Sequence, residues 1–399
     1  RVFYARRPIL EIAVKNFLEN QSFQADFKHF EKSNRLWLDD FAEFMAIKEH
    51  FGNQALQKWD DKKAVARDPS ALEKYRTMLA EQIQYFKVTQ YFFFKQWTEL
   101  KNYANQKGIQ IIGDMPIYVA ADSVEVWTKP ELFQLDEERN PLFVAGVPAD
   151  QFSATGQLWG NPLYAWEEHK KQGYAWWIHR IEESFKIYDV LRIDHFKGFS
   201  DYWQVDGKAE VAKDGSWQPG PGYDLFKAVK EQLGDLPIIA EDLGNIDDKA
   251  RKLLTDCNYP GMKILQFGFE DVSGESLDSP HYCIPHSIVY TGTHDNDVTN
   301  GWYNSLTEQQ QQYINDYTHR HEDESICQAM IRQLFATVSN TAIATMQDVL
   351  DLPASSRMNV PSTIGGNWQW RMQQSDLTQD KKDFLAKMTT LYQRANQEK

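Results

Sequence analysis

The stretch YDVLRIDHFKGF (residues 188–199) decides the fold class of this chain. Its first half has the apolar pattern of a buried β-strand, and the pattern breaks at Asp194 into a polar, glycine-containing segment. Two later stretches repeat this design, LPIIAEDLGN (236–245) and SIVYTGTHDNDVT (287–299). Because the carboxyl ends of parallel strands share one edge of a sheet, we expect the three acids to converge where barrel enzymes carry their chemistry.

Strands and helices alternate outward from these three stretches. Other β-type runs lie at 108–119, 261–269 and 341–350, and the intervening sequence leaves room for helices such as 222–233 and 325–339. Alternation of this kind favours a parallel sheet with crossover helices. An open doubly wound sheet is the alternative, but no GxGxxG follows a strand. We therefore expect an α/β fold and favour a barrel, on that absence and on the three acids.

The parts outside the barrel strands have different compositions. Residues 1–107 read mainly as helix, and the apolar spacing after Asp68-Pro69 predicts one long amphipathic helix that runs to Gly108. Residues 120–175 are rich in Gly, Pro, Asn and aromatics, which predicts a loop-rich insertion over the barrel mouth. A second loop is expected from Met346 to about Arg371. Residues 108–119 and 188–399 are left to supply the barrel strands and helices.

Charge and cysteine content narrow the classes of partner and the compartment. The 43 Lys and Arg against 57 Asp and Glu give a net charge of −14, which would repel nucleic acid. The three cysteines are widely spaced without a CxxC pair, so we expect no disulfide framework and a reducing cytoplasmic location. No apolar run reaches the roughly 20 residues of a membrane helix. We expect a protein that binds neither nucleic acid nor membrane.

The residues around the acids suggest separate roles. Arg192 and Asp194 are two apart on a strand and share a face, so the guanidinium favours the ionised carboxylate that a nucleophile needs. Glu241 ends an almost entirely apolar strand, where partial desolvation favours the protonated form of a general acid. Asp295 is expected to share a strand face with Thr293 and to stabilise a cationic transition state. Two carboxyls of opposite protonation are what glycoside cleavage requires, although a single acid at a strand end is more often a cap or an ion-pair partner.

Six segments in order resemble glycoside hydrolase family 77, the 4-alpha-glucanotransferases or amylomaltases. RIDHFKGF is similar to the family's nucleophile segment, IAEDLG to its acid/base segment and YTGTHDND to its third-acid segment. GDMPIYVAADSVEVW, GVPADQFSATGQLWGNPLY and RMNVP with NWQWR also match. The resemblance covers essentially the whole chain. It implies an α/β fold of the (β/α)8 TIM barrel type with inserted subdomains, which acts on α-1,4-glucans by a retaining double displacement.

The resemblance also implies roles for particular residues. Asp194 matches the nucleophile, Glu241 the acid/base and Asp295 the third acid. Further contacts to the glucan donor and acceptor are implied, without metal or cofactor, for Arg192, His294, Asp114, His195, Asp150, Trp159 and Asn359. Family members usually begin with a segment that carries the first two barrel strands, whereas this chain starts at Arg1. We therefore expect residues 1–399 to form a catalytic barrel that lacks those strands.

Three other functions stay open at the sequence level. The same three acids would serve an α-glucan hydrolase of the same clan, because water can also take the covalent intermediate. A non-catalytic glucan-binding protein is another, which the intact acids disfavour. A metal-dependent barrel hydrolase would use the group His195, Glu241, Asp242, His294 and Asp297, but no HxH or HExxH stands at a strand end. The sequence does not indicate the oligomeric state.

Overall fold

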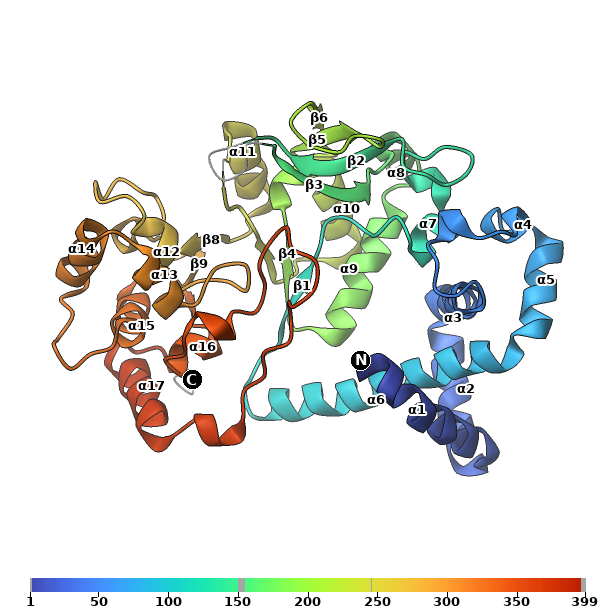
Figure 1. The fold of residues 1–399 in the computed structure, drawn as a ribbon, viewed down its shortest axis with the longest axis horizontal. Helices are drawn as coiled ribbons and strands as arrows, with labels where there is room; N and C mark the ends of the chain where they lie inside the picture. The colour runs from blue at the N-terminus through green and yellow to red at the C-terminus, as the bar shows by residue number, and fades with distance from the viewer. Residues whose placement is uncertain (1, 150–154, 245, 396–399) are drawn as a thin grey trace. The chain divides into compact units, whose positions relative to one another are not determined.

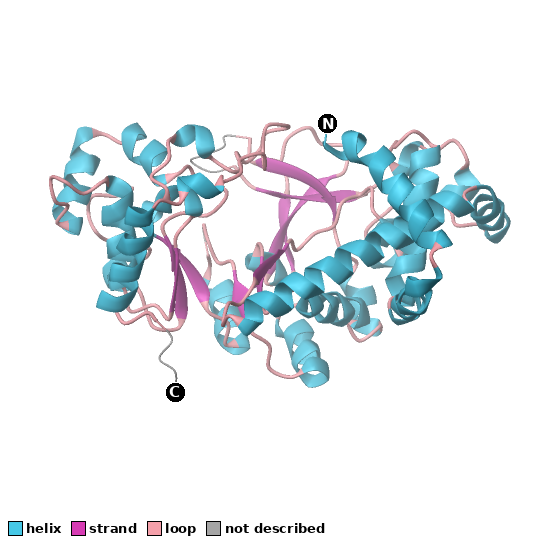
Figure 2. Cartoon of the chain, turned by 90° about the horizontal axis from the view of Figure 1, so that it is seen from below, coloured by secondary structure: helices cyan, strands magenta, loops and turns pink. Residues whose placement is uncertain are grey.

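The computed structural model describes residues 2–149, 155–244 and 246–395. The chain divides into two compact units, Arg1–Ile238 and Ile239–Lys399. Figure 2, in which helices are cyan and strands magenta, shows that helix is the commoner element. In the described part of the chain, every helix is too short or too polar to cross a membrane.

The first hundred residues of unit 1 are helical, as predicted. Helix α3 packs along α6, and Leu38, Ala42, Ile47 and Val88 are fully buried in this region. The helices are α1 (Val2–Glu19), α2 (Gln24–Ser33), α3 (Arg35–His50), α4 (Lys62–Val65), α5 (Pro69–Met78) and α6 (Ala80–Gln106).

The single long helix predicted after Asp68 is wrong, because the chain leaves the helical conformation at Leu79. The Asp68 side chain caps α5 by accepting from the backbone N–H groups of Ser70 and Ala71 at 3.0 and 3.3 Å. Leu79 has φ −112° and ψ 23°, and α6 begins at the next residue. Since the Leu79 side chain is only 6% exposed, it keeps the apolar spacing intact across the break. Periodicity alone therefore does not reveal the division.

Parallel strands carry the candidate site of unit 1. Strands β1 (Ile112–Met115) and β4 (Val190–Ile193) pair in parallel, with Asp114 opposite Arg192, and lie side by side in Figure 1. The sheet order is β1, β4, β7 (Ile238–Ala240). Helix α9 (Ala175–Ile187) packs on both β1 and β4 and against α10 (Tyr223–Leu233), which is the arrangement of a crossover helix.

The region 120–175, predicted as a loop, contains regular secondary structure among its described residues. It supplies two strands of a four-stranded antiparallel sheet and two short helices, α7 (Val124–Thr128) and α8 (Trp166–Lys171). The strand order is β3 (Gln157–Pro162), β2 (Phe143–Val147), β5 (Asp201–Asp206), β6 (Ser216–Pro219). Many of its aromatics are core, since Trp127 and Tyr164 are 0% and 1% exposed. The sequence did not indicate this sheet because turn-forming residues separate its short strands.

Unit 2 contains a second parallel sheet in the order β10, β9, β8. Sequential strands are therefore neighbours, as in a barrel wall. The strands are β8 (Gly261–Ile264), β9 (Ser287–Tyr290) and β10 (Thr341–Ile343). The helices are α11 (Asp248–Cys257), α12 (Leu265–Gly268), α13 (Thr299–Ser305), α14 (Glu308–Thr318), α15 (Ile326–Ala336), α16 (Met346–Val349) and α17 (Gln379–Leu391). The predicted loop after Met346 contains the short α16 and is otherwise irregular up to Arg371, apart from a 3-10 turn at Ala354–Ser356.

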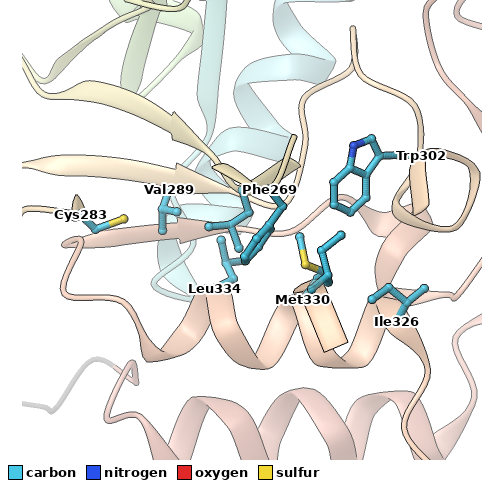
Figure 3. Close-up of a cluster of buried hydrophobic side chains, with 9 residues drawn as sticks. Phe269, Cys283, Val289, Trp302, Ile326, Met330 and Leu334 are labelled. Atoms are coloured by element: carbon cyan, nitrogen blue, oxygen red, sulfur yellow. The ribbon is translucent and has the colours of Figure 1, made fainter. Parts of the chain in front are cut away.

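A compact apolar core joins the sheet of unit 2 to its helices. Figure 3 shows Met330 and Leu334 of α15 pointing toward Phe269, with Val289 of β9 beside them. Phe269, Val289, Met330 and Leu334 are all fully buried. This cluster supports the strand β9, which leads into the Asp295 segment.

The α/β fold class is confirmed, and strands occur at each of the six β-type runs singled out in the sequence. Among the described residues the parallel strands pair as two three-stranded sheets, and these pairings do not close a barrel.

Candidate active site

Arg192 holds two carboxylates at the end of the parallel strands of unit 1. Its Nη1 donates to Asp114 Oδ1 at 2.6 Å and to Asp194 Oδ1 at 2.9 Å. The Arg192 side chain is 9% exposed, whereas those of Asp114 and Asp194 are 43% and 42% exposed. The Asp194 N–H donates to Met115 O at 3.0 Å, which fixes the backbone directly after β4. The predicted meeting of Arg192 and Asp194 is confirmed, and Asp114 joins them from β1.

His195 follows Asp194 and contacts an aromatic ring from β3. Its backbone has φ 50°, where the chain turns from β4 into the 3-10 turn Phe196–Phe199. The His195 and Trp159 rings meet edge to face, with centroids 4.8 Å apart. Burial of the imidazole lowers the pKa of His195 to about 4, so the ring is neutral at pH 7. Trp159 keeps 37% of its surface exposed and can offer a flat apolar face.

Glu241 lies in unit 2, directly after β7. Its Oε1 accepts a hydrogen bond from the Leu243 N–H at 2.9 Å. Ala240, just before it, is fully buried, and its N–H donates to Pro260 O at 3.0 Å. The apolar strand end expected before this acid is therefore present.

The segment that carries Asp295 is a turn and not a strand. Strand β9 ends at Tyr290, so the prediction that Thr293 and Asp295 share a strand face is wrong. Asn296 Oδ1 accepts from the Thr293 N–H and Oγ1 at 2.8 and 2.9 Å, and Thr293 Oγ1 accepts from the Asp295 N–H at 3.3 Å. Local side-chain bonds to the backbone replace the ladder here, as they commonly do in turns.

Two predicted contact residues lie beside Asp295. Asn359 Nδ2 donates to Asp295 Oδ1 at 2.7 Å, and His294 Nε2 lies 3.4 Å from Asp295 Oδ2. The His294 ring is 5.0 Å from that of Trp368, centroid to centroid. Unit 2 thus gathers an acid, an amide and a histidine next to an exposed tryptophan. Asp150 lies outside the described residues.

The metal-dependent alternative also used Asp242 and Asp297, and both of these carboxylates accept hydrogen bonds from the backbone. Asp242 Oδ1 accepts from the Met262 N–H at 2.7 Å, and Asp297 Oδ1 accepts from the Val298 N–H at 2.8 Å. A Cβ at Gly261 would clash with the Asp242 carboxylate, and one at Gly301 would clash with the Asp297 carboxylate. Burial raises the pKa of Asp242, and the Met262 N–H opposes that rise. These contacts give both carboxylates a structural role.

Comparison with known proteins identifies the family of this chain. The family model described as 4-alpha-glucanotransferase matches residues 1–378. The chain belongs to the 4-alpha-glucanotransferase family, glycoside hydrolase family 77. The 4-alpha-glucanotransferase of Streptococcus pneumoniae is 52% identical over 398 residues, which is 100% of this chain and 78% of that protein. The family assignment from the motifs is confirmed.

A solved structure in this family has the same fold. The amylomaltase from Streptococcus agalactiae in complex with acarbose is 59% identical, with a TM-score of 0.97 over 99% of this chain and 79% of that one. The amylomaltase from Corynebacterium glutamicum is 16% identical with a TM-score of 0.66, which shows the fold alone. The chain is therefore a glycosyltransferase with 4-alpha-glucanotransferase activity, and glucans are its substrate class.

Sequence reasoning missed Arg357, which binds the Asp295 segment. Its Nη2 donates to the backbone carbonyl of Asp295 at 2.6 Å, and its Nε donates to that of Asn359 at 2.9 Å. The signal available was an arginine two residues before Asn359 in a loop otherwise poor in charge. A bond to a backbone carbonyl 62 positions away leaves no pattern in the sequence.

Proposed function

We propose that the chain transfers α-1,4-glucan segments by a retaining double displacement. The Asp194 carboxylate attacks C1 of the donor sugar while the bond from C1 to the leaving O4 breaks and Glu241 gives its proton to that oxygen. An acceptor 4-hydroxyl then loses its proton to Glu241 and attacks C1, which frees Asp194. The observation that carries this proposal is the ion pair between Arg192 and Asp194, because it holds a partly exposed carboxylate in place at a strand end.

Asp295 is assigned the role of third acid. Its Oδ1 is oriented by Asn359, while 44% of the side chain stays exposed to meet a substrate. A fixed carboxylate of this kind binds hydroxyls of the reacting sugar and stabilises the positive charge that develops at C1. Asp114, His294, Asn359, His195 and Asp150 complete the proposed contacts to the donor glucan.

Transfer to a sugar in place of water requires a bound acceptor. Trp159 contacts His195, the residue after Asp194, and Trp368 contacts His294, the residue before Asp295. The two rings are 37% and 60% exposed, so each offers a face on which an α-1,4-glucan can stack. We assign Trp159 and Trp368 to the binding of glucan chains.

Trapping tests the covalent step. In Glu241→Gln, an α-maltotriosyl fluoride donor needs no acid for its first step but lacks the base for the second. We expect the peptide that contains Asp194 to gain the mass of one glucan segment, and the Asp194→Asn/Glu241→Gln variant to gain none. A label on another peptide, or a product of inverted anomeric configuration by NMR, contradicts the proposal.

Product analysis tests whether the glycosyl-enzyme intermediate reacts with a sugar hydroxyl or with water. With maltotriose, transfer yields a ladder of longer glucans at a constant number of reducing ends, whereas hydrolysis raises that number steadily. We expect Trp368→Ala to increase the hydrolysed fraction, with Trp217→Ala, at an exposed ring in β6, as the matched control. An unchanged fraction in Trp368→Ala removes the acceptor role from this ring.

Two further assignments rest on sequence patterns. The cytoplasmic location follows from the three separated cysteines, and the division into a helical region 1–107, an insertion 120–175 and a barrel is proposed from composition.

Retention requires the carboxyls of Asp194 and Glu241 about 5–5.5 Å apart. A crystal structure with a bound oligosaccharide tests that separation, and a value near 9 Å excludes retention.

A further inference from the structure

Arg357 closes a ring of hydrogen bonds around the third acid. Its Nη2 binds the backbone oxygen of Asp295 and its Nε binds that of Asn359. Asn359 in turn donates from Nδ2 to the Asp295 carboxylate at 2.7 Å. One guanidinium therefore fixes both the main chain of the acid and the main chain of the residue that orients its carboxylate.

The Asp295 segment needs such support because no strand pairing holds it. Strand β9 ends at Tyr290, and Asp295 lies within a turn closed by Thr293 and Asn296. These turn bonds fix the backbone N–H of Asp295, whereas Arg357 fixes its carbonyl. Hydrogen bonds from a charged donor are about twice as strong as neutral ones.

The loop after Arg357 is closed by its own contacts. The Trp368 N–H donates to Met358 O at 2.7 Å, and Asn367 Oδ1 accepts from the Val360 N–H at 3.0 Å. Because this loop ends at Trp368, whose ring contacts His294, it touches the acid segment at both of its ends. Arg357 stands at the base of the loop and joins it to Asp295.

We propose that Arg357 is a positioning residue for glucan transfer, which sets the orientation of the Asp295 carboxylate through the main chains of Asp295 and Asn359. The inference rests on the proposed role of Asp295 as the third acid. Loss of the guanidinium frees the acid to move, and a misplacement of about 1 Å costs roughly 100-fold in rate. The binding of a glucan chain along the rest of the site is unaffected, so the loss falls on kcat.

Steady-state kinetics with maltotriose test this, with glucose release as the readout. We expect Arg357→Met to lower kcat by about 10- to 100-fold while KM changes by less than about threefold. Arg394→Met is the matched control, since Arg394 also donates to backbone carbonyls, those of Phe335, Thr337 and Ser339. It is expected to lower the melting temperature while kcat stays within about twofold. Equal kcat losses in the two variants overturn the inference.

A double-mutant cycle separates positioning from general damage. If Arg357 acts through Asp295, the double variant Asp295→Asn/Arg357→Met stays within about twofold of Asp295→Asn alone. Fully additive losses overturn the inference and leave the role of Asp295 intact. Unchanged activity in Asp295→Asn overturns both the inference and the proposed third acid. Added guanidinium chloride at millimolar concentration should partly restore kcat in Arg357→Ala but not in Asp295→Asn.

Discussion

Arg192 and Asp194 form an ion pair of 2.9 Å at the end of β4, and the nitrogen that makes it also binds Asp114 on β1. The parallel register explains the arrangement, because Asp114 stands directly opposite Arg192. The Arg192 guanidinium thus offsets the repulsion between the Asp114 and Asp194 carboxylates at the carboxyl ends of these strands. The arginine side chain is almost buried, whereas the two carboxylates are 43% and 42% exposed, so solvent partly screens these contacts.

Replacement of Arg192 should therefore reduce catalysis more than substrate binding. We expect Arg192→Lys to lower kcat on maltotriose by at least about 10-fold, since the shorter lysine side chain ends before the position from which Nη1 binds both acids. Initial rates of glucose release provide the measurement.

Arg332→Lys is the matched control for Arg192→Lys. Arg332 pairs with Glu324 through Nε and Nη2 at 2.8 and 2.7 Å. We expect Arg332→Lys to lower the free energy of unfolding and to leave kcat unchanged. A kcat for Arg192→Lys equal to that of the unmodified enzyme removes Arg192 from the site.

Asn359 should be intolerant of a negative charge. In Asn359→Asp a carboxylate faces Asp295 Oδ1 across the present 2.7 Å contact, so repulsion adds to the lost hydrogen bond. We expect kcat to fall further than in Asn359→Ala, by about 10-fold or more. Asn367→Asp, in the same loop, controls for charge. A lower kcat in Asn359→Ala than in Asn359→Asp contradicts the contact between Asn359 and Asp295.

Stability should fall as the pH drops below about 6.5 because His169 is buried. Its ring is 1% exposed, and burial lowers its pKa from 6.5 to about 4. Between these two values the unfolded state binds the proton and the folded state does not, so the stability present above pH 6.5 is lost as the pH falls toward 4. The loss is about 2 kcal/mol at pH 5.

Urea unfolding at pH 7 and pH 5 measures this effect. We expect His169→Gln to lose less stability than the unmodified chain between the two pH values. His286→Gln, at an exposed histidine, should leave the difference unchanged. Parallel behaviour of His169→Gln and the unmodified chain would falsify the assignment.

The core in Figure 3 should respond strongly to a lost ring. Phe269 is fully buried among Leu265, Met330 and Leu334, so Phe269→Ala leaves a cavity under the sheet of unit 2. We expect a loss of about 3–5 kcal/mol in the free energy of unfolding. Leu277→Ala, at a side chain 54% exposed, should change it by less than about 0.5 kcal/mol.

The predicted strands and the predicted turns differ in how well they match the structure. The runs that became β4, β7 and β9 were found because buried parallel strands are short and apolar. The break at Leu79 was missed because the buried side chain preserves the helical period. Residues 120–175 looked like a loop because the segments around the short strands β2 and β3 are rich in turn-forming residues, and β5, the partner of β2, begins more than 50 residues after β2 ends.

The sequence by itself determined the α/β class, the order of the acid-bearing strands and the pairing of Arg192 with Asp194. Each of these follows from local periodicity or from residues two apart on one strand. Only the tertiary structure decided that Asp295 sits in a turn, that Asn359 orients it and that Arg357 binds both main chains. The two bonds to Asp295, from Arg357 and from Asn359, join residues more than 60 positions apart, and a backbone carbonyl accepts a hydrogen bond whatever its side chain, so no residue pattern records them.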